Sequence, residues 1–180
     1  MTDKNIVLVG FMGTGKTSVG KILAKKTGRQ VVDIDHCIED AQKRRIADIF
    51  EREGEAYFRS LEKEMIRKVS AGRSQVITTG GGAVMDQENL SLLRSGGLLI
   101  ELTAKPETIH ARVKGTRNRP LLKAPDVLGR IRRMLEERGP YYAKADWHFF
   151  TDGLSAEQVA EAIVKRLESE PDLEYGKDRS

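Results

Sequence analysis

The sequence predicts an α/β fold in which helices cover both faces of a parallel β-sheet. Two observations support this fold. Short apolar runs alternate along the chain with stretches whose apolar residues have helical spacing, and the first apolar run leads directly into a glycine-rich loop and then into a helical pattern. We expect the strands at residues 4–9, 30–34, 75–79, 97–102 and 147–151.

The length and composition are those of one soluble domain. The chain has 180 residues, of which 39% are hydrophobic and 32% are charged, and no apolar run approaches the ~20 residues that span a bilayer. Cys37 is the single cysteine, and the chain begins directly with a strand. We therefore expect a cytoplasmic protein without a membrane partner, with one domain over residues 1–168 and a flexible tail over residues 169–180.

The loop after the first strand carries the most specific motif. From Gly10 to Thr17 its sequence is GFMGTGKT, which matches the phosphate-loop pattern G-x-x-x-x-G-K-[ST] at every fixed position. Glycines let successive N–H groups point at phosphate oxygens, and the N-terminus of the following helix adds a positive dipole. Lys16 would reach the β- and γ-phosphates, and the Thr17 hydroxyl would coordinate Mg²⁺. A plain glycine-rich turn is the alternative, but the strand–loop–helix context favours a nucleoside triphosphate site.

Two helices are defined by their ends. The helix after the loop should run from Thr17 to Gly28, because glycine is the preferred residue just past a helix end. The last helix should begin at a capping box formed by Ser155 and Gln158. Its apolar stripe comprises Ala156, Val159, Ala160, Ile163 and Leu167.

Two longer segments interrupt the alternation of strands and helices. Residues 36–72 have helical patterns throughout, whereas residues 114–125 are basic. The net charge is only +4, but basic side chains crowd one part of the chain, at Arg112, Lys114, Arg117, Arg119 and Lys123. Such a cluster could bind nucleic acid. Polyphosphate is the simpler partner beside a phosphate loop, so we expect no nucleic-acid partner.

Polar groups and bare backbone follow two of the predicted strands. Asp33 and Asp35 close the second strand, and side chains two residues apart on a strand point to the same side. The third strand ends in three consecutive glycines, Gly80–Gly82, which let a ligand approach the backbone closely. Open α/β sheets hold ligands at the carboxyl ends of their strands. We therefore expect both carboxylates and the glycines beside the phosphate loop.

A helical segment after a turn at residues 53–55 brings Arg59 and Glu62 together. They are three residues apart and lie beside an apolar stripe, so their side chains should be neighbours. An ordinary surface ion pair is the alternative. The stripe comprises Phe58, Leu61, Met65 and Val69.

Arg138 is the most informative residue outside the phosphate loop. It lies in a helix that we expect to end before Gly139, and it continues the inward stripe of Leu128, Ile131 and Leu135. A charge that points inward must meet a counter-charge or line a cavity. A guanidinium there is suited to bidentate binding of a carboxylate.

Together these motifs resemble those of the shikimate kinase family, in unbroken order over roughly residues 4–168. Besides the phosphate loop, the chain has the family's Asp-x-Asp, GE-x-x-FR-x-x-E, GGG, RPLL and ERxPxY motifs. They lie at Asp33–Asp35, Gly54–Glu62, Gly80–Gly82, Arg119–Leu122 and Glu137–Tyr141. The resemblance implies a P-loop nucleoside-monophosphate-kinase-like fold with five parallel strands in the order 2-3-1-4-5. It also implies a helical substrate-binding insert at about residues 36–72 and a mobile lid at about residues 114–125.

The resemblance further implies a reaction, the ATP-dependent phosphorylation of the shikimate 3-hydroxyl in the route to chorismate and the aromatic amino acids. By this likeness the catalytic residues are Lys16, Asp35 and Arg119. The ATP-binding residues are Gly13, Thr14, Gly15, Lys16, Thr17, Ser18, Arg112 and Arg119. The shikimate-binding residues are Asp35, Arg59, Gly81, Gly82, Arg138, Phe50, Phe58, Glu62 and Leu121. One Mg²⁺ per subunit is held beside Thr17 and Asp33.

Within these sets the likeness gives some residues a definite task. Arg59 and Arg138 would clamp the substrate carboxylate, Asp35 would hold the shikimate hydroxyls, and Arg112 would stack on adenine. Residues 151–155, which flank adenine in the family, contain no basic side chain here, so their contacts would come from the backbone. Arg117 has no assigned role.

Two other functions remain open at this point. A gluconate-kinase-like enzyme would need no paired arginines for a ring carboxylate, and the GGG and RPLL motifs argue against it. A non-catalytic, nucleotide-switched binding module would tolerate the loss of Asp35 or Arg119, and this chain keeps both. We expect a monomer that acts on ATP and shikimate.

Overall fold

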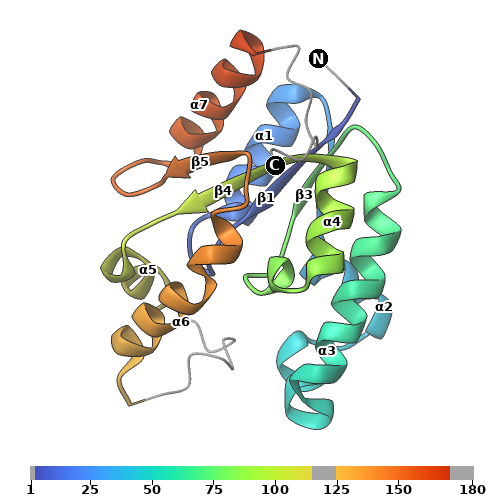
Figure 1. Ribbon diagram of the computed structural model, residues 1–180, viewed down its shortest axis with the longest axis vertical. Coiled ribbons are helices and arrows are strands. Elements are labelled where there is room, and N and C mark those ends of the chain that lie inside the picture. Colours follow the sequence, from blue (N-terminus) through green and yellow to red (C-terminus); the bar gives the residue numbers. More distant parts are fainter. Residues whose placement is uncertain (1–2, 115–124, 171–180) are drawn as a thin grey trace.

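The computed structural model describes residues 3–114 and 125–170 (Figure 1). The predicted lid, with Arg117, Arg119 and Leu121, therefore lies almost entirely outside the described residues. The same is true of the predicted tail beyond residue 170.

Five strands form one parallel sheet in the order β2-β3-β1-β4-β5. In its centre, Val7 of β1 lies opposite Ile77 of β3 and Leu99 of β4. Each strand agrees with its predicted range to within one residue, and the order is the one that the resemblance implies, so the predicted fold is confirmed. The strands are β1 (Asn5–Val9), β2 (Gln30–Asp33), β3 (Gln75–Thr78), β4 (Gly97–Thr103) and β5 (Trp147–Phe150).

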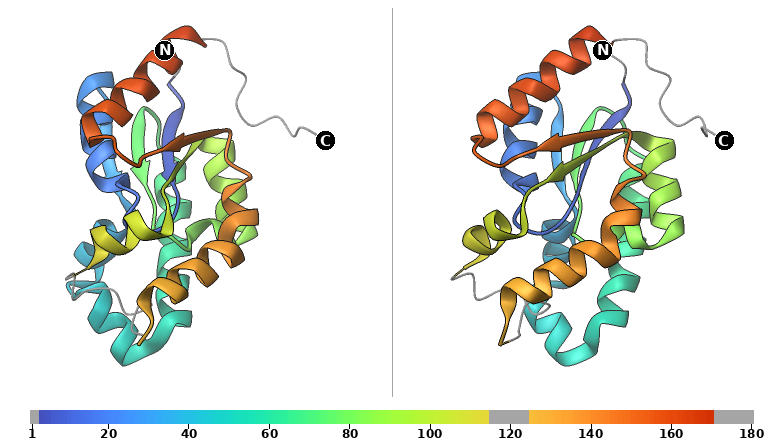
Figure 2. Two further views of the ribbon diagram at one scale, coloured as in Figure 1. Left: turned by 90° about the vertical axis from the view of Figure 1, so that its left-hand side faces the viewer. Right: turned by 60° about the vertical axis from the view of Figure 1, so that its left-hand side comes forward.

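The helices of the described residues are α1 (Lys16–Thr27), α2 (Ile34–Gln42), α3 (Ile46–Ser70), α4 (Gln87–Gly96), α5 (Pro106–Val113), α6 (Val127–Tyr142) and α7 (Ala156–Ser169), with a short 3₁₀ helix η1 (Ala83–Met85) after β3. Helices α1 and α7 lie on one side of the sheet, and α3 and α4 lie on the other (Figures 1 and 2). The structure is therefore a three-layer α/β/α arrangement.

The alternation of side chains along β1 explains the two layers. Ile6 and Leu8 are buried against α1 and α7, whereas Val7 and Val9 are buried in the cluster that contains α3, α4 and α6. All of these side chains are at most 2% exposed, so the central strand is covered on both faces.

Both predicted helix ends are confirmed. Gly28 follows α1 with a φ of 67°, and its N–H donates to the Ala24 carbonyl, the left-handed ending that glycine allows. At the start of α7, the Gln158 N–H donates to the Ser155 hydroxyl at 3.2 Å, and the Ser155 N–H donates to the Gln158 side chain at 2.8 Å. These local contacts set the bounds of both helices.

The position of Asp35 differs from the prediction. Strand β2 ends at Asp33, and Asp35 lies in the first turn of α2 instead of on the strand. The reason is a helix cap, because the Asp33 side chain accepts a hydrogen bond from the His36 N–H at 3.2 Å. The argument from strand alternation was therefore wrong for Asp35, although both carboxylates still lie at the same edge of the sheet.

The insert of residues 36–72 is helical with two breaks. Helix α2 ends at Gln42 and is followed by Lys43, which has a φ of 52°. Helix α3 then begins at Ile46. Within α3, Gly54 has φ 83° and ψ 175°, which is the turn predicted at residues 53–55. The prediction of a wholly helical insert was thus nearly correct, and the break at Gly54 changes the direction of α3 between Phe50 and Phe58.

One further prediction, the end of the helix that carries Arg138, needs correction. Helix α6 does not end before Gly139 but continues through Pro140 to Tyr142, and its buried positions are Ile131, Met134, Arg138 and Tyr142. Phe150, at the end of β5, is 51% exposed. His148, two residues earlier on the same face of the strand, is exposed as well, so this face of β5 is not covered.

Candidate active site

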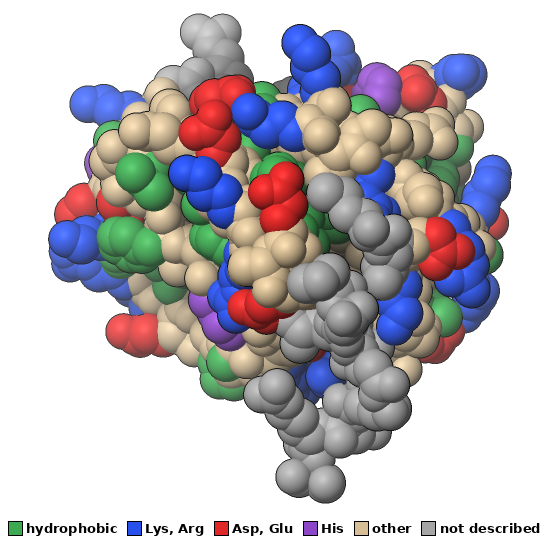
Figure 3. Space-filling model, turned by 90° about the horizontal axis from the view of Figure 1, so that it is seen from above, with side chains coloured by type: hydrophobic (Ala, Val, Ile, Leu, Met, Phe, Trp, Pro, Cys, Tyr) green, Lys and Arg blue, Asp and Glu red, His purple; other side chains and the backbone are tan. Residues whose placement is uncertain are grey.

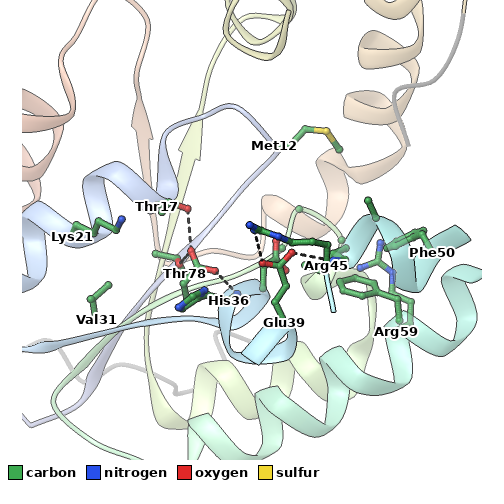
Figure 4. Close-up of a pocket in the computed structure, with 18 of the residues that line it drawn as sticks. Met12, Thr17, Lys21, Val31, His36, Glu39, Arg45, Phe50, Arg59 and Thr78 are labelled. Carbon is green, nitrogen blue, oxygen red and sulfur yellow. Dashed lines mark hydrogen bonds and ion pairs between the residues drawn. The ribbon is translucent and has the colours of Figure 1, made fainter. Parts of the chain in front are cut away.

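Two adjoining cavities lie at the carboxyl ends of the strands. The larger has a volume of about 590 Å³ and is lined by α2, α3, α6 and the glycines after β3 (Figure 4). The smaller, of about 310 Å³, is lined by the phosphate loop. Six residues line both cavities, so the two spaces open into each other there. They are Met12, Thr17, Asp33, Asp35, Gly80 and Gly81.

The phosphate loop has the backbone that the motif requires. Gly10, Gly13 and Gly15 have φ values of 130°, 78° and 99°, a range that L side chains rarely adopt. A Cβ at Gly10 would also lie 2.2 Å from the Leu102 carbonyl oxygen. Both the backbone conformation and the lack of space therefore require glycine at this position. The loop can therefore curl towards the smaller cavity.

Side chains of the loop hold this shape from within. The Lys16 ammonium donates to the carbonyl oxygens of Gly10 and Phe11, both at 2.8 Å, and the Thr14 hydroxyl donates to Phe11 O at 2.8 Å. Lys16 is only 8% exposed, while Thr17 and Ser18 are exposed in the first turn of α1 and line the smaller cavity. Five of the predicted ATP-binding residues, Gly13, Gly15, Lys16, Thr17 and Ser18, thus lie together around the smaller cavity.

A hydroxyl–carboxylate cluster lies where the two cavities meet. Asp33 Oδ2 accepts hydrogen bonds from the Thr17 hydroxyl at 3.0 Å and from the Thr78 hydroxyl at 2.8 Å (Figure 4). These are hard oxygen donors of the kind that Mg²⁺ prefers. The described residues contain no group of three or more His, Cys, Asp or Glu side chains that could hold a metal. The oxygen donors of the cluster therefore fit a Mg²⁺ ion.

Arg59 is held by two carboxylates at the wall of the larger cavity. Its Nη1 lies 2.6 Å from Glu62 Oε2 and its Nη2 lies 3.1 Å from Glu55 Oε1. Glu62 is inaccessible to solvent, so this is more than the surface ion pair considered above. The ion pair orients the guanidinium.

Burial and pairing act in opposite directions on these two residues. Burial raises the pKa of the Glu62 carboxyl even though the Arg59 guanidinium opposes the rise. Burial lowers the pKa of Arg59, but its ion pairs with Glu62 and Glu55 outweigh burial and leave that pKa above its ordinary value. Arg59 therefore stays charged beside a carboxylate that is costly to keep ionised.

The glycines after β3 fit between these charged groups. A Cβ at Gly80 would lie 2.7 Å from Glu62 Oε1 and 3.1 Å from Asp35 Oδ1, and a Cβ at Gly82 would lie 2.5 Å from Arg59 Nη2. Only backbone without a side chain leaves the guanidinium of Arg59 and the carboxylate of Glu62 in place. The glycines thus leave room for the protein's own charged side chains, and the close approach of a ligand to their backbone stays a prediction.

Arg138 points into the site as predicted. It is 6% exposed, its Nη1 donates to the Gly81 carbonyl at 3.2 Å, and it lines the larger cavity. The same carbonyl accepts a hydrogen bond from the hydroxyl of Tyr142, a residue that the sequence reasoning missed. The last position of the ERxPxY motif falls on Tyr142 and not on Tyr141, and Tyr142 lies one turn after Arg138 on the same helix face. That spacing could have identified it.

Apolar rings form the remaining wall of the larger cavity. Phe50 and Phe58 lie on either side of the break in α3, with ring centroids 4.8 Å apart. Between the rings and the Thr17–Asp33 cluster lie Glu39 and Arg45, which the sequence reasoning did not single out (Figure 4). Glu39 accepts a hydrogen bond from the Ile46 N–H at 3.0 Å and so fixes the start of α3.

Arg112 lies beside the phosphate loop. Its Nη1 donates to the Gly13 carbonyl at 3.2 Å and to the Thr151 hydroxyl at 3.0 Å, and its Nη2 donates to Thr151 O at 2.9 Å. The guanidinium thus joins the loop to the first residue of the 151–155 segment. Its stacking on adenine stays a prediction.

Two of the histidines, and the basic side chains of one face, lie near acidic side chains. In the face shown in Figure 3, basic side chains are interspersed with acidic ones. His36 pairs with Asp40 at 3.4 Å, and His148 Nδ1 lies 2.6 Å from Glu101 Oε2. Within residues 3–114 and 125–170, no helix is both long enough and apolar enough to cross a membrane.

Comparison with known proteins is consistent with this geometry. The model of the shikimate kinase family matches residues 12–168. The shikimate kinase of Thermodesulfovibrio yellowstonii is 48% identical over 92% of this chain and 95% of its own length. The shikimate kinase of Symbiobacterium thermophilum is 47% identical over 91% of this chain and 96% of its own length.

Solved structures agree with the sequence comparison. The shikimate kinase of Acinetobacter baumannii in complex with shikimate superposes with a TM-score of 0.91 and 35% identity, covering 96% of this chain and 97% of the other. The shikimate kinase of Aquifex aeolicus superposes with a TM-score of 0.78 and 33% identity. The match covers 92% of this chain and 96% of the other. A sugar kinase from Janibacter at 20% identity and a TM-score of 0.57 shares the fold alone.

Proposed function

Since this chain belongs to the shikimate kinase family, we propose that its two cavities bind ATP and shikimate side by side. The enzyme transfers the γ-phosphate of ATP to the 3-hydroxyl of shikimate, which gives shikimate 3-phosphate and ADP. We assign the cavities in this way because six residues line both of them. A phosphate bound in one cavity and a hydroxyl bound in the other can meet only at this shared rim. Positioning of the two reactants supplies much of such a rate enhancement.

The smaller cavity holds the triphosphate in this proposal. The N–H groups from Gly13 to Ser18 and the Lys16 ammonium bind the β- and γ-phosphates, which requires Lys16 to exchange its two carbonyl partners for phosphate oxygens. Arg119, outside the described residues, adds a second positive charge to the transferring phosphate, and Arg112 contacts the adenine. Charge neutralisation is the main chemical demand of phosphoryl transfer.

Thr17 and Asp33 are the residues that would hold Mg²⁺, one ion per subunit. Their side chains are already 3.0 Å apart, and Thr78 orients the same carboxylate oxygen. When bound, the ion neutralises charge on the phosphate oxygens. Asp33 would assist the ion through its bound waters.

The larger cavity holds shikimate. The guanidinium groups of Arg59 and Arg138 bind its carboxylate, and the rings of Phe50 and Phe58 pack against its apolar face. Glu62 keeps Arg59 oriented, at a distance of 2.6 Å. Gly81 and Gly82 offer backbone contacts, and the family likeness adds an apolar contact from Leu121, which lies outside the described residues.

Asp35 is the group that takes the proton. It lines both cavities and therefore lies at the rim where the acceptor hydroxyl enters. As the hydroxyl oxygen bonds to the γ-phosphorus and the bond to the bridging oxygen of ADP breaks, the hydroxyl proton passes to the Asp35 carboxylate. Release of this proton to solvent regenerates the enzyme.

A coupled assay of ADP release tests this function. We expect Mg²⁺-dependent ADP release with shikimate, much less with quinate, and none above background with gluconate or without acceptor. Asp35→Asn should lower kcat strongly while the Kd for ATP stays within about twofold, because the amide can hydrogen-bond but cannot accept the proton. Equal turnover with gluconate, or a near-normal kcat in Asp35→Asn, would contradict the proposal.

We further propose that the enzyme works as a cytoplasmic monomer. Both cavities are lined by residues of a single chain, so one chain can complete the described part of the site. The single cysteine, Cys37, suits a reducing compartment. Sedimentation of the purified protein at working concentration tests the oligomeric state.

A further inference from the structure

One backbone oxygen in the acceptor cavity receives two hydrogen bonds from the same helix. The Gly81 carbonyl accepts from Arg138 Nη1 at 3.2 Å and from the hydroxyl of Tyr142. Arg138 and Tyr142 are four residues apart on α6, so both side chains leave the helix on one face. A carbonyl oxygen has two lone pairs, and these two donors use both.

Gly81 is the point at which three parts of the site meet. A Cβ built there would lie 3.3 Å from the Met12 nitrogen and 3.6 Å from the Gly10 carbonyl oxygen, both in the phosphate loop. It would lie 3.5 Å from Arg138 Nη1. Gly81 also lines both cavities. Any shift of this residue therefore reaches the nucleotide side and the acceptor side together.

The neighbouring residue connects this point to the other arginine. The Arg59 guanidinium packs directly on Gly82, since a Cβ there would lie 2.5 to 2.8 Å from three of its atoms. The peptide group between Gly81 and Gly82 is planar, so the direction of the Gly81 carbonyl also sets the direction of the Gly82 N–H. One peptide plane thus lies against both arginines, through the Gly81 carbonyl for Arg138 and through Gly82 for Arg59.

Tyr142 is suited to hold that plane. Its side chain is 3% exposed and its ring packs in the core cluster on the α3 side of the sheet, so the hydroxyl has little freedom to turn away. Burial raises the pKa of its hydroxyl to about 12, and the hydroxyl therefore remains a donor throughout the physiological pH range.

We propose that Tyr142 is a positioning residue for the acceptor, which sets the Gly81–Gly82 peptide so that Arg138 and Arg59 meet the substrate carboxylate in the right orientation. This inference rests on the proposed function of the cavity. Without the hydroxyl, Arg138 is the single donor to the Gly81 carbonyl among residues 3–114 and 125–170, and its guanidinium can follow that carbonyl away from the substrate. Tyr142 acts through Gly81 and Arg138 and has no contact with the phosphate that is transferred.

The test compares two tyrosines that are adjacent in the sequence. Tyr142→Phe removes one oxygen and keeps the ring that packs in the core. Tyr141→Phe is the matched control, because Tyr141 is on the same helix with its ring 5.7 Å from the Lys144 ammonium. We expect the KM for shikimate to rise about three- to tenfold in Tyr142→Phe, as for the loss of one hydrogen bond. The KM for ATP and the kcat should change less than about twofold, and Tyr141→Phe should match the wild type.

A double-mutant cycle tests the shared carbonyl. If Tyr142 acts through Arg138, the rise in the KM for shikimate in the pair Tyr142→Phe with Arg138→Lys should be clearly smaller than the product of the single effects. A purely structural role would instead lower the Tm without a selective change in this KM, and independent roles would give multiplicative effects. Either result overturns the inference.

The outcomes also separate this inference from the proposed function. If the wild type releases ADP with shikimate and Tyr142→Phe is indistinguishable from it, only the inference fails. If the wild type shows no shikimate-dependent ADP release, the proposed function fails and the inference fails with it.

Discussion

The guanidinium carbon of Arg138 lies 5.7 Å from the centroid of the Phe11 ring, so a residue of α6 rests on an apolar residue of the phosphate loop. Phe11 is only 1% exposed and belongs to the core, which makes it a rigid support. A cation over an aromatic face is favourable when both are shielded from water. Arg138 is therefore held from two sides, by Phe11 and by the Gly81 carbonyl, with the rest of its guanidinium available to the cavity.

Replacing Arg138 with lysine should weaken acid recognition selectively. Arg138→Lys keeps the charge but loses the planar fork that matches a carboxylate. We expect the KM for shikimate to rise by roughly ten- to a hundredfold, equivalent to about 1.5–3 kcal/mol, while the KM for ATP stays close to that of the wild type. Steady-state kinetics with each substrate varied in turn measures both values.

A methyl ester of shikimate provides the control for that prediction. The wild type should use the ester poorly because its arginines then lack a charged partner. In Arg138→Met the preference for the free acid over the ester should largely disappear. If this variant still prefers the free acid as strongly as the wild type does, Arg138 is structural and the carboxylate is bound elsewhere.

Gly82→Ala should displace Arg59. The new methyl group would lie 2.5 Å from Arg59 Nη2, and the guanidinium cannot move aside freely because Glu62 and Glu55 hold it. We expect a rise of at least about tenfold in the KM for shikimate, and some loss of Tm because the buried Glu62 carboxylate loses part of its pairing. Gly139→Ala is the matched control, since a Cβ there meets nothing within 4 Å. Similar kinetics in the two variants would refute the steric explanation.

Glu62 should make shikimate binding sensitive to acid. Burial raises the pKa of its carboxyl above the ordinary 4.5, so the folded chain binds this proton more tightly than the unfolded chain does. Protonation of Glu62 on acidification therefore does not destabilise the fold. It removes the negative charge of Glu62 and so weakens the ion pair that orients Arg59.

We accordingly expect the KM for shikimate to rise as the pH is lowered from neutral through the raised pKa of Glu62. In Glu62→Gln, which cannot be ionised, the KM should be raised already at neutral pH and should depend less on pH over the same range. Initial rates at several pH values, with ATP saturating, measure this. An identical pH dependence in the wild type and in Glu62→Gln would assign the effect to another group.

Lys16→Ala should abolish phosphoryl transfer in a folded protein. The substitution removes the positive charge at the phosphates, although it also removes two hydrogen bonds to the loop, at Gly10 and Phe11. Some loss of Tm is therefore expected, of the size that one or two hydrogen bonds contribute. ADP release and a thermal melt should be measured on the same sample, and substantial activity in a folded variant would argue against the phosphate-loop assignment.

Asp33→Asn should raise the requirement for Mg²⁺. The amide can still accept hydrogen bonds from Thr17 and Thr78, but it has no charge to attract the hydrated ion. A titration of activity against Mg²⁺ at fixed ATP should shift to higher concentration by several-fold. The Asp33 side chain also caps α2, so circular dichroism should accompany the titration. An unchanged titration in a folded variant would remove Asp33 from the metal side of the site.

The local parts of this structure were predictable from short stretches of sequence. The strands agree to within one residue, Gly28 ends α1, and Ser155 and Gln158 begin α7 as expected. The reason is that burial alternation, helix spacing and caps depend on residues only a few positions apart. The phosphate loop belongs to the same class, because its function depends on contiguous glycines and one lysine.

Some local predictions failed where two tendencies compete within a few residues. The segment Asp33–Asp35 could extend the strand or begin a helix, and the side chain of Asp33 decides for the helix by capping it. Pro140 usually breaks a helix, yet α6 continues to Tyr142, whose ring and hydroxyl are anchored in the core and at Gly81. Packing elsewhere in the molecule outweighs the local preference in that case.

The sequence alone determined the strand order through its family likeness, the phosphate loop through its spacing, and the inward direction of Arg138 through helical periodicity. Tertiary structure alone decided that Arg59 of α3 and Arg138 of α6 face one peptide plane, at Gly81 and Gly82. Periodicity states which face of a helix a residue occupies but not what lies opposite that face. That depends on how two helices, distant in sequence, pack around the turn after β3, and this packing is a property of the whole fold.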